Sequence, residues 1–160
     1  MDIGQRRLIE ELYLEMYDKL LTYARCSLDG ESLAEEAVQE AVQIACQKID
    51  SLQESPNPRG WMFKTVKNTI RNIKHNQANA SRILTQYLMV QEDTSLEDQH
   101  SLETLYGRVA ETEEFKLLKE FTIDKRSHFE MARDRGITVA ACKKRLQRAK
   151  EYLHIKILEE

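Results

Sequence analysis

The sequence predicts an all-α fold, made of two small helical domains joined by a linker. Only two prolines and five glycines occur among 160 residues, and the chain is rich in Ala, Leu, Glu, Lys and Gln, which favour helices. Apolar side chains also recur every three or four residues, which is the spacing of a helix that buries one side. Together these observations favour helices along most of the chain.

Two helices are expected at the amino-terminal end. The first spans about residues 5–27, and Asp29–Gly30 then gives a turn signal. The second spans about residues 31–49, and its outer side carries acids and amides without one cation: Glu36, Gln39, Glu40, Gln43 and Gln47. Exposed helices usually mix charge signs to gain i,i+4 pairs. This stripe is therefore either a docking surface for a basic partner or a simple solvated face.

A loop and a third helix follow. Residues 50–58 contain both prolines, and Pro58 is well placed to begin a helix over about residues 59–75. The outer side of that helix gathers cations and an amide, with Trp61 at its edge: Lys64, Lys67, Asn68, Arg71 and Lys74. Such a face suits single-stranded or distorted DNA. Trp61 is at least as readily explained as a packing residue.

Residues 76–99 are polar and end in an acidic run, which predicts a linker. The alternative is that residues 83–90 extend the third helix. Residues 102–109 and 112–121 then show two further helical patterns. We expect these two helices to support the last part of the chain.

Residues 127–158 predict two helices joined by a tight turn. The first spans residues 128–135, and Gly136 tolerates the positive φ with which many helices end. Thr138 offers a hydroxyl cap to the second helix. That second helix has one apolar stripe: Val139, Cys142, Leu146, Ala149, Leu153 and Ile157.

The opposite side of this last helix indicates DNA binding. Between Thr138 and Lys150 there are five Lys or Arg residues and no acid. The residues on or beside the outer face are Lys143, Lys144, Gln147 and Arg148. Lys, Gln and Arg reach base edges in a major groove, and neighbouring cations contact phosphates, as in a helix-turn-helix. The alternative is the basic, solvated face of an ordinary helical hairpin.

The charges are unevenly distributed along the chain. The formal net charge is −3, yet residues 55–91 hold six basic residues and no acid, and residues 124–158 hold ten basic and four acidic residues. The remainder carries a net charge of −15. Two basic segments on an acidic chain suggest two contacts with a polyanion and other surfaces for different partners.

Other functional classes find little support in the sequence. Cys26, Cys46 and Cys142 are far apart, so we expect buried free thiols and no disulfide or metal site. No paired carboxylates, nucleophile with a base, or phosphate-binding glycine loop indicates an enzyme, and no cofactor is expected. No apolar run reaches membrane-spanning length and no signal peptide is recognisable, which predicts a cytoplasmic protein without membrane insertion.

Several motifs, in order, resemble those of the extracytoplasmic-function (ECF) sigma factors of the sigma-70 family. Residues 34–40, AEEAVQE, resemble the acidic–hydrophobic–Gln–Glu signature of sigma domain 2. Residues 58–64, PRGWMFK, with the later Asn68, resemble the Pro-x-x-Trp helix of the same domain. Residues 127–132, with the later Val139, Lys143, Arg145–Leu146 and Arg148–Lys150, resemble the helix-turn-helix of sigma domain 4.

The resemblance implies three interfaces. The clamp helices of the largest polymerase subunit would contact Glu36, Gln39, Glu40 and Gln43. The −10 element would meet a loop that captures a flipped base and the helix that follows it: Gln53, Glu54, Ser55, Asn57, Trp61, Lys64, Lys67, Asn68 and Arg71. The −35 element would contact Lys143, Lys144, Gln147 and Arg148.

The resemblance also implies a domain order: sigma domain 2 over residues 1–78, a linker over 79–100 and sigma domain 4 over 101–160. The chain would be a promoter-specificity subunit without catalytic activity, with bacterial core RNA polymerase and promoter DNA as partners. An anti-sigma factor is a common further partner in the family. Ala140–Ala141 and Lys144 depart from the family's usual Gly-Thr and Ser, which bears on the −35 sequence but not on the architecture.

Two other functions are compatible with parts of the pattern. A sigma-like decoy would bind an anti-sigma factor without DNA, and the retained cations in both basic segments argue against it. An ordinary two-domain DNA-binding regulator has no need for a cation-free stripe of Glu and Gln. Neither alternative explains both modules as economically.

Overall fold

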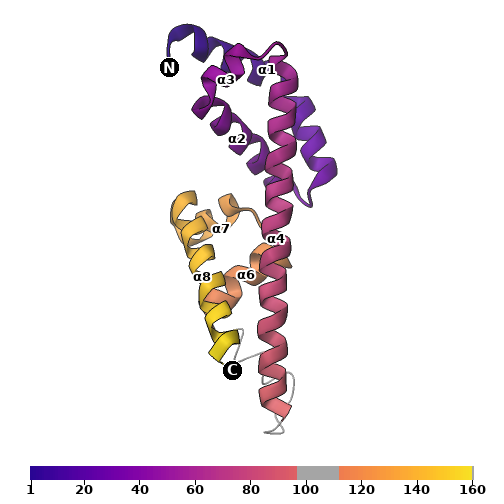
Figure 1. Ribbon diagram of the computed structural model, residues 1–160, viewed down its shortest axis with the longest axis vertical. Coiled ribbons are helices and arrows are strands. Elements are labelled where there is room, and N and C mark those ends of the chain that lie inside the picture. Colours follow the sequence, from indigo (N-terminus) through magenta and orange to yellow (C-terminus); the bar gives the residue numbers. More distant parts are fainter. Residues whose placement is uncertain (97–111, 160) are drawn as a thin grey trace. The chain divides into compact units, whose positions relative to one another are not determined.

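The protein is described by a computed structural model, which covers the backbone of residues 1–96 and 112–159 and the side chains of residues 1–90 and 112–159. Every regular element in those residues is an α-helix (Figure 1), which confirms the predicted all-α class. The chain forms two compact units, Met1–His75 and Asn76–Glu160. The helices are α1 (Ile3–Ser27), α2 (Glu31–Gln47), α3 (Ile49–Glu54), α4 (Pro58–Leu96), α6 (Glu113–Thr122), α7 (His128–Arg135) and α8 (Val139–Glu159).

Helix α1 begins with a capping box. The Asp2 carboxylate accepts the backbone N–H of Gln5 at 2.7 Å, and the Gln5 side chain accepts the backbone N–H of Asp2 at 3.1 Å. At the other end the chain turns at Gly30, whose φ of 100° favours glycine. Arg25 forms a salt bridge with Glu31 across this turn, so side chains as well as backbone join α1 to α2.

Helices α1 and α2, with the first part of α4, enclose the core of the amino-terminal unit. Alanines on the inner side of α2 are fully buried and let the neighbouring helices approach closely. The buried Thr69 hydroxyl of α4 lies within hydrogen-bonding distance of two carbonyls, that of Val66 in its own helix at 2.8 Å and that of Ala37 in α2 at 3.1 Å. The buried core residues are Leu12, Met16, Leu20, Leu21, Ala24, Leu28, Leu33, Ala34, Ala37, Val38, Ala41, Ala45, Leu52, Met62, Val66, Ile70 and Ile73.

The predicted loop over residues 50–58 is partly helical. Helix α3 follows directly after α2, and only residues 55–57 are left between α3 and α4. Leu52 explains the difference, because its side chain is fully buried and anchors this short helix in the core despite polar neighbours. The Gln5 amide strengthens the attachment by donating to Asp50 at 3.2 Å and to Gln53 at 3.0 Å.

Helix α4 occupies residues 79–96 of the linker predicted over residues 79–100, and the last four residues of that prediction lie outside the described residues. One helix continues from Pro58 to Leu96, and its second part belongs to the carboxy-terminal unit. The reason is an apolar stripe at helical spacing inside a polar stretch: Ala80, Ile83, Leu84 and Tyr87. The alternative of a helical extension over residues 83–90 is therefore the one that the chain adopts.

The carboxy-terminal unit combines the second part of α4 with α6, α7 and α8 (Figure 1). Helix α6 begins after Thr112, whose hydroxyl accepts the N–H of Phe115 at 3.4 Å, and it corresponds to the helix predicted over residues 112–121. The helix predicted over residues 102–109 lies outside the described residues. The buried core consists of Ala80, Ile83, Leu84, Tyr87, Phe115, Leu117, Leu118, Phe121, Met131, Ala132, Cys142, Leu146, Ala149 and Leu153.

The thiols are less buried than the sequence predicts. Cys142 lies in the core, whereas Cys26 and Cys46 are exposed, and none of the three forms a disulfide. Their neighbours Ala24 and Ala45 occupy the inner positions of α1 and α2, which leaves both cysteines on the outside. Among the helices described, none combines the length and the apolar character that crossing a bilayer requires.

Candidate nucleic-acid interface

The segment between α3 and α4 presents polar side chains in a fixed shape. Asn57 caps α4: its side-chain oxygen accepts the backbone N–H of Gly60 at 3.0 Å, while its own backbone N–H donates to the Ser55 hydroxyl at 3.2 Å. Gln53 and Glu54 are exposed at the end of α3. Asn57 therefore shapes the loop, along which Gln53, Glu54, Pro56 and Asn57 itself are exposed to solvent.

Trp61 joins the two helices that flank this loop. Its indole is half-buried against the core of the amino-terminal unit, and Nε1 donates to the Ser51 hydroxyl of α3 at 3.4 Å. These contacts support the packing interpretation of Trp61. The indole also holds α3 next to the start of α4, where the cationic face begins.

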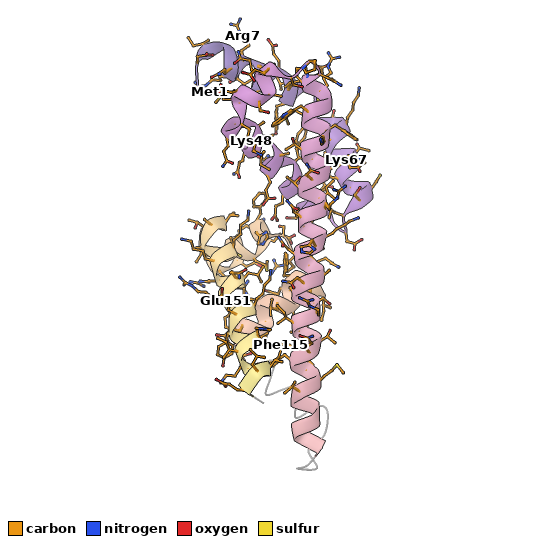
Figure 2. All side chains as sticks on the ribbon, in the orientation of Figure 1. Met1, Arg7, Lys48, Lys67, Phe115 and Glu151 are labelled. Carbon is orange, nitrogen blue, oxygen red and sulfur yellow. The ribbon has the colours of Figure 1, made fainter. Side chains whose placement is uncertain are left out.

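The outer side of the first part of α4 is a continuous cationic face. Met62, Val66 and Ile70 turn inward, while the predicted DNA-binding residues beside them are exposed: Lys64, Lys67, Asn68 and Arg71. Lys67 is labelled on this helix in Figure 2. Within the described residues, none of the three cations forms a salt bridge. The face is therefore available to an external polyanion.

The stripe of acids and amides on α2 is exposed only in part. Gln39 and Gln43 are exposed and Glu40 is half-buried. Glu36 is completely buried, which corrects its prediction as a surface residue. Position 36 lies one helical turn after Leu33 on a helix that is buried over most of its circumference, so the carboxylate faces the interior, where a buried charge requires polar partners.

Helices α7 and α8 are joined by the turn that the sequence predicts. Gly136 has a φ of 64° in the left-handed region, and its N–H bonds back to the carbonyl of Arg133 at 3.2 Å. The Thr138 hydroxyl accepts the N–H of Ala141 at 3.0 Å and so caps α8. The predicted positive φ and the predicted cap are both confirmed.

Helix α8 divides into an inner and an outer side as predicted. Cys142, Leu146, Ala149 and Leu153 are buried, and Val139 and Ile157 are half-buried at the two ends of the stripe. On the outer side, the predicted DNA-binding residues Lys144, Gln147 and Arg148 are exposed, and Lys143 is half-buried. The Gln147 amide donates to Glu151 at 3.2 Å. Three of the four predicted side chains are thus open to solvent.

Ion pairs fasten α7 to α6. Arg135 of α7 donates to Glu120 at 2.6 Å and to Glu113 at 3.1 Å. Arg126, between the two helices, donates to Glu120 at 3.2 Å and also to Asp134. Glu120 therefore receives both guanidinium groups, and the side chains of all three are less than a quarter exposed. The cluster fixes the helix that precedes α8.

The same contacts change the acidities of these groups. The hydrogen bond from Arg126 is the main reason that the pKa of Asp134 lies below its usual value, and that bond raises the pKa of Arg126. Burial acts to lower the pKa of Arg135, but its hydrogen bonds to Glu120 and Glu113 outweigh burial and raise it. Arg126, Asp134 and Arg135 are consequently charged at neutral pH.

Lys150 has a different environment from the exposed cations of α8. Its side chain is half-buried, and its Nζ lies 5.8 Å from the ring centroid of Phe121. Burial lowers the pKa of Lys150 below its usual value. Among the residues that the structure describes, no carboxylate forms a salt bridge with it.

Helical periodicity does not single out Arg126, Arg135 or Glu120, or the contact between Gln5 and α3. The one sequence feature that could have pointed to the ion-pair cluster is the polar stretch between Phe121 and Ser127, which separates two helices with apolar inner sides. No group of three or more His, Cys, Asp or Glu side chains within residues 1–90 and 112–159 is arranged to hold a metal ion.

A comparison with family models finds that residues 12–79 match sigma-70 region 2. The matched region begins within α1 and includes α2, α3 and the cationic part of α4, so it contains both the partly exposed Gln and Glu stripe and the loop capped by Asn57. No curated protein matches the chain. The match makes this part of the chain similar to region 2 of the sigma-70 factors, which supports a role in transcription initiation.

Proposed function

We propose that this chain, whose residues 12–79 match sigma-70 region 2, is an alternative sigma factor of the ECF type. It binds core RNA polymerase in the cytoplasm and directs the enzyme to promoters through two DNA contacts. One observation supports this proposal above all. The chain is acidic as a whole, yet it exposes two cationic faces, one on the first part of α4 in the amino-terminal unit and one on α8 in the carboxy-terminal unit.

The first unit acts as sigma domain 2. Gln53, Glu54 and Ser55 form the loop that receives a flipped base of the −10 element, and Asn57 keeps that loop in shape through its contact with Gly60. The exposed residues of α4 then hold the melted strand: Lys64, Lys67, Asn68 and Arg71. Trp61 supports this contact from the side of the loop, where its indole joins α3 to α4.

The second unit acts as sigma domain 4, with α7 and α8 as its helix-turn-helix. Helix α8 enters the major groove of the −35 element, where Lys144, Gln147 and Arg148 reach base edges and Lys143 contacts a phosphate. Exposed Ala140 at the start of α8 leaves room for a close approach. We include the second part of α4 in this domain, because its buried residues belong to the core of the carboxy-terminal unit.

The docking surface for polymerase lies on α2. Gln39, Glu40 and Gln43 present a cation-free surface that suits the basic side of a coiled coil. Buried Glu36 supports this surface from within and makes no direct contact with the partner. An anti-sigma factor is a further partner that the ECF resemblance implies.

Reconstituted transcription tests the proposal. The chain is mixed with bacterial core polymerase lacking any sigma factor and with fragments of the genome, and the 5′ ends of the transcripts are mapped. We expect defined start sites that share two spaced upstream elements. The matched control is the variant Gln39→Lys, which should fold normally but bind core polymerase more weakly. Polymerase binding without defined starts would favour the decoy, and promoter binding by the isolated chain would favour a regulator.

A further inference from the structure

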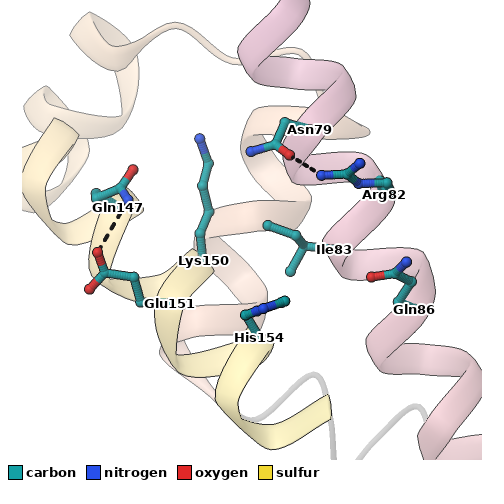
Figure 3. A pocket seen from close by; sticks show the side chains of 8 residues that line it. All are labelled: Asn79, Arg82, Ile83, Gln86, Gln147, Lys150, Glu151 and His154. Atoms are coloured by element: carbon teal, nitrogen blue, oxygen red, sulfur yellow. Dashed lines mark hydrogen bonds between the residues drawn. The ribbon is translucent and has the colours of Figure 1, made fainter. Parts of the chain in front are cut away.

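A groove lies between the second part of α4 and α8, within the carboxy-terminal unit (Figure 3). Its volume is about 400 Å³, which is within the range of small-ligand sites, roughly 300–1,000 Å³. Arg82 lines it from α4, and Lys150 and His154 line it from α8. Three nitrogen-bearing basic side chains from two helices thus face one space.

The remaining polar lining consists mainly of side-chain amides, which can donate or accept hydrogen bonds. Asn79, Gln86 and Gln147 contribute side-chain amides to the groove. The lining contains one carboxylate, Glu151, which accepts the Gln147 amide at 3.2 Å and is turned toward Gln147 in Figure 3. Two cations and a histidine around a space whose one carboxylate is occupied favour an anionic ligand over a cation.

Lys150 provides the strongest reason to expect an anion. Figure 3 shows its side chain extending between Gln147 and Asn79. The ammonium is partly desolvated against Phe121 and, within the described residues, forms no salt bridge. A desolvated charge without a counter-ion is unfavourable, and a bound anion would supply the missing partner.

Arg82 is held in a position that complements Lys150. One guanidinium nitrogen of Arg82 donates to the Asn79 side chain at 2.7 Å, one helical turn away. That bond uses one of the five guanidinium N–H donors, and a guanidinium fork matches the oxygens of a phosphate. The groove also adjoins Gln147, a residue of the proposed base-reading face of α8.

We propose that the groove between α4 and α8 binds a phosphate group through Lys150, Arg82 and His154. The binding of a phosphate group does not depend on the proposed function, but the assignment of that phosphate to promoter DNA does. If the source is the DNA backbone, α4 adds a phosphate contact beside the −35 element. If the source is a free phosphorylated small molecule, the groove is an effector site next to the base-reading face.

The first experiment titrates the full chain with inorganic pyrophosphate and follows the side-chain signals of Lys150 and His154 by NMR, against sodium chloride at equal ionic strength. We expect saturable shifts and an affinity at least tenfold weaker in Lys150→Gln and in Arg82→Gln. Lys156→Gln is the matched control, because Lys156 lies on the same helix but pairs with Glu159 at 3.5 Å outside the groove. Non-saturating shifts, or equal affinities in Lys150→Gln and Lys156→Gln, would overturn the proposal.

The second experiment identifies the source with holoenzyme and promoter DNA. For a backbone phosphate, Lys150→Gln should reduce the slope of log Kobs against log salt by about one, and pyrophosphate should compete with DNA. For a free ligand, the slope stays unchanged and pyrophosphate binds the DNA-bound holoenzyme equally well. If the chain binds pyrophosphate but supports no transcription, the phosphate site is retained and the proposed function is refuted. If the chain supports transcription but does not bind pyrophosphate, the proposed function is retained and the phosphate site is refuted.

Discussion

The side chain of Asn57 and the backbone of Gly60 are in such close contact that position 60 accommodates only a glycine without adjustment. The Asn57 oxygen accepts the Gly60 N–H at 3.0 Å, and a Cβ built on Gly60 would lie 2.5 Å from the Asn57 side-chain nitrogen. Gly60 therefore serves the cap of α4 and, through it, the shape of the loop proposed to receive a −10 base.

We expect Gly60→Ala to displace the Asn57 side chain and to be less stable than a matched Gly→Ala control elsewhere in a helix by about 1 kcal/mol, the usual contribution of an N-cap. The measurement is urea unfolding followed by circular dichroism. Gly4→Ala is the matched control, because a Cβ there would meet Asp2 at an ordinary 3.4 Å. That control should be neutral or stabilising, since alanine favours helices over glycine. Equal stability of both variants would show that the cap adapts without cost.

Glu120→Gln should destabilise the carboxy-terminal unit by about 1–3 kcal/mol, because it leaves the partly buried guanidiniums of Arg126 and Arg135 without their shared carboxylate. Thermal unfolding of the full chain measures the change. Glu159→Gln serves as the control, since the Lys156–Glu159 pair is exposed and should contribute less than about 1 kcal/mol. Similar losses in both variants would contradict a structural role for the cluster.

Asp134 should make stability depend on pH in the acidic range. Its pKa is lower in the folded chain than in the unfolded chain, mainly because Arg126 donates to it. The unfolded state then binds more protons as pH falls, so the stabilisation is complete above the unfolded pKa and is lost as pH falls through the folded pKa. We expect Asp134→Asn to flatten the decline of the unfolding midpoint below about pH 4–5. A decline of unchanged steepness would show that other carboxylates dominate.

Substitutions on α2 should separate folding from polymerase binding. Glu36→Lys should unfold the amino-terminal unit, because it replaces a fully buried carboxylate with an opposite charge, and loss of a buried partner typically costs about 3–5 kcal/mol. Gln39→Lys changes an exposed position of the same helix, so the circular dichroism spectrum should be retained while core polymerase binding weakens. Binding of Gln39→Lys as tight as that of the parent chain would place the docking surface elsewhere.

Local patterns in the sequence were sufficient to predict most of the helices and the inner side of α8. Gly136 and Thr138 are an example, because the left-handed turn and the cap depend on residues next to one another in the chain. The burial of Glu36 was not predictable, since helical periodicity gives the side of a helix but not how much of its circumference neighbouring helices cover. The contact between Gln5 and Gln53 joins residues far apart in the sequence, and no local pattern carries such information.

The extent of α4 shows why composition misleads at a domain boundary. Five of the eleven residues 76–86 are Asn, Gln or Ser, which predicts a linker, yet Ala80, Ile83 and Leu84 are buried. A few apolar residues at helical spacing decide the conformation, because burying them favours helix more than the polar neighbours oppose it. The predicted cationic face of α4 is not affected by this correction, because Lys64, Lys67 and Arg71 lie earlier on the same helix.

The final prediction concerns the outer face of α8. Lys144→Ala and Arg148→Ala should each weaken binding of holoenzyme to a matched promoter by about 1–3 kcal/mol for every base that the removed side chain recognises, because both side chains are exposed on the face proposed to enter the major groove. Competition between the promoter and a version with a scrambled −35 element measures this discrimination. Lys64→Ala is the control, since α4 is proposed to act on the −10 strand: it should slow promoter opening, measured with permanganate, and leave discrimination at −35 intact. Full discrimination in both α8 variants would remove this face from −35 recognition, whereas a loss of discrimination in the Lys64 variant would mean that the two faces do not read separate elements.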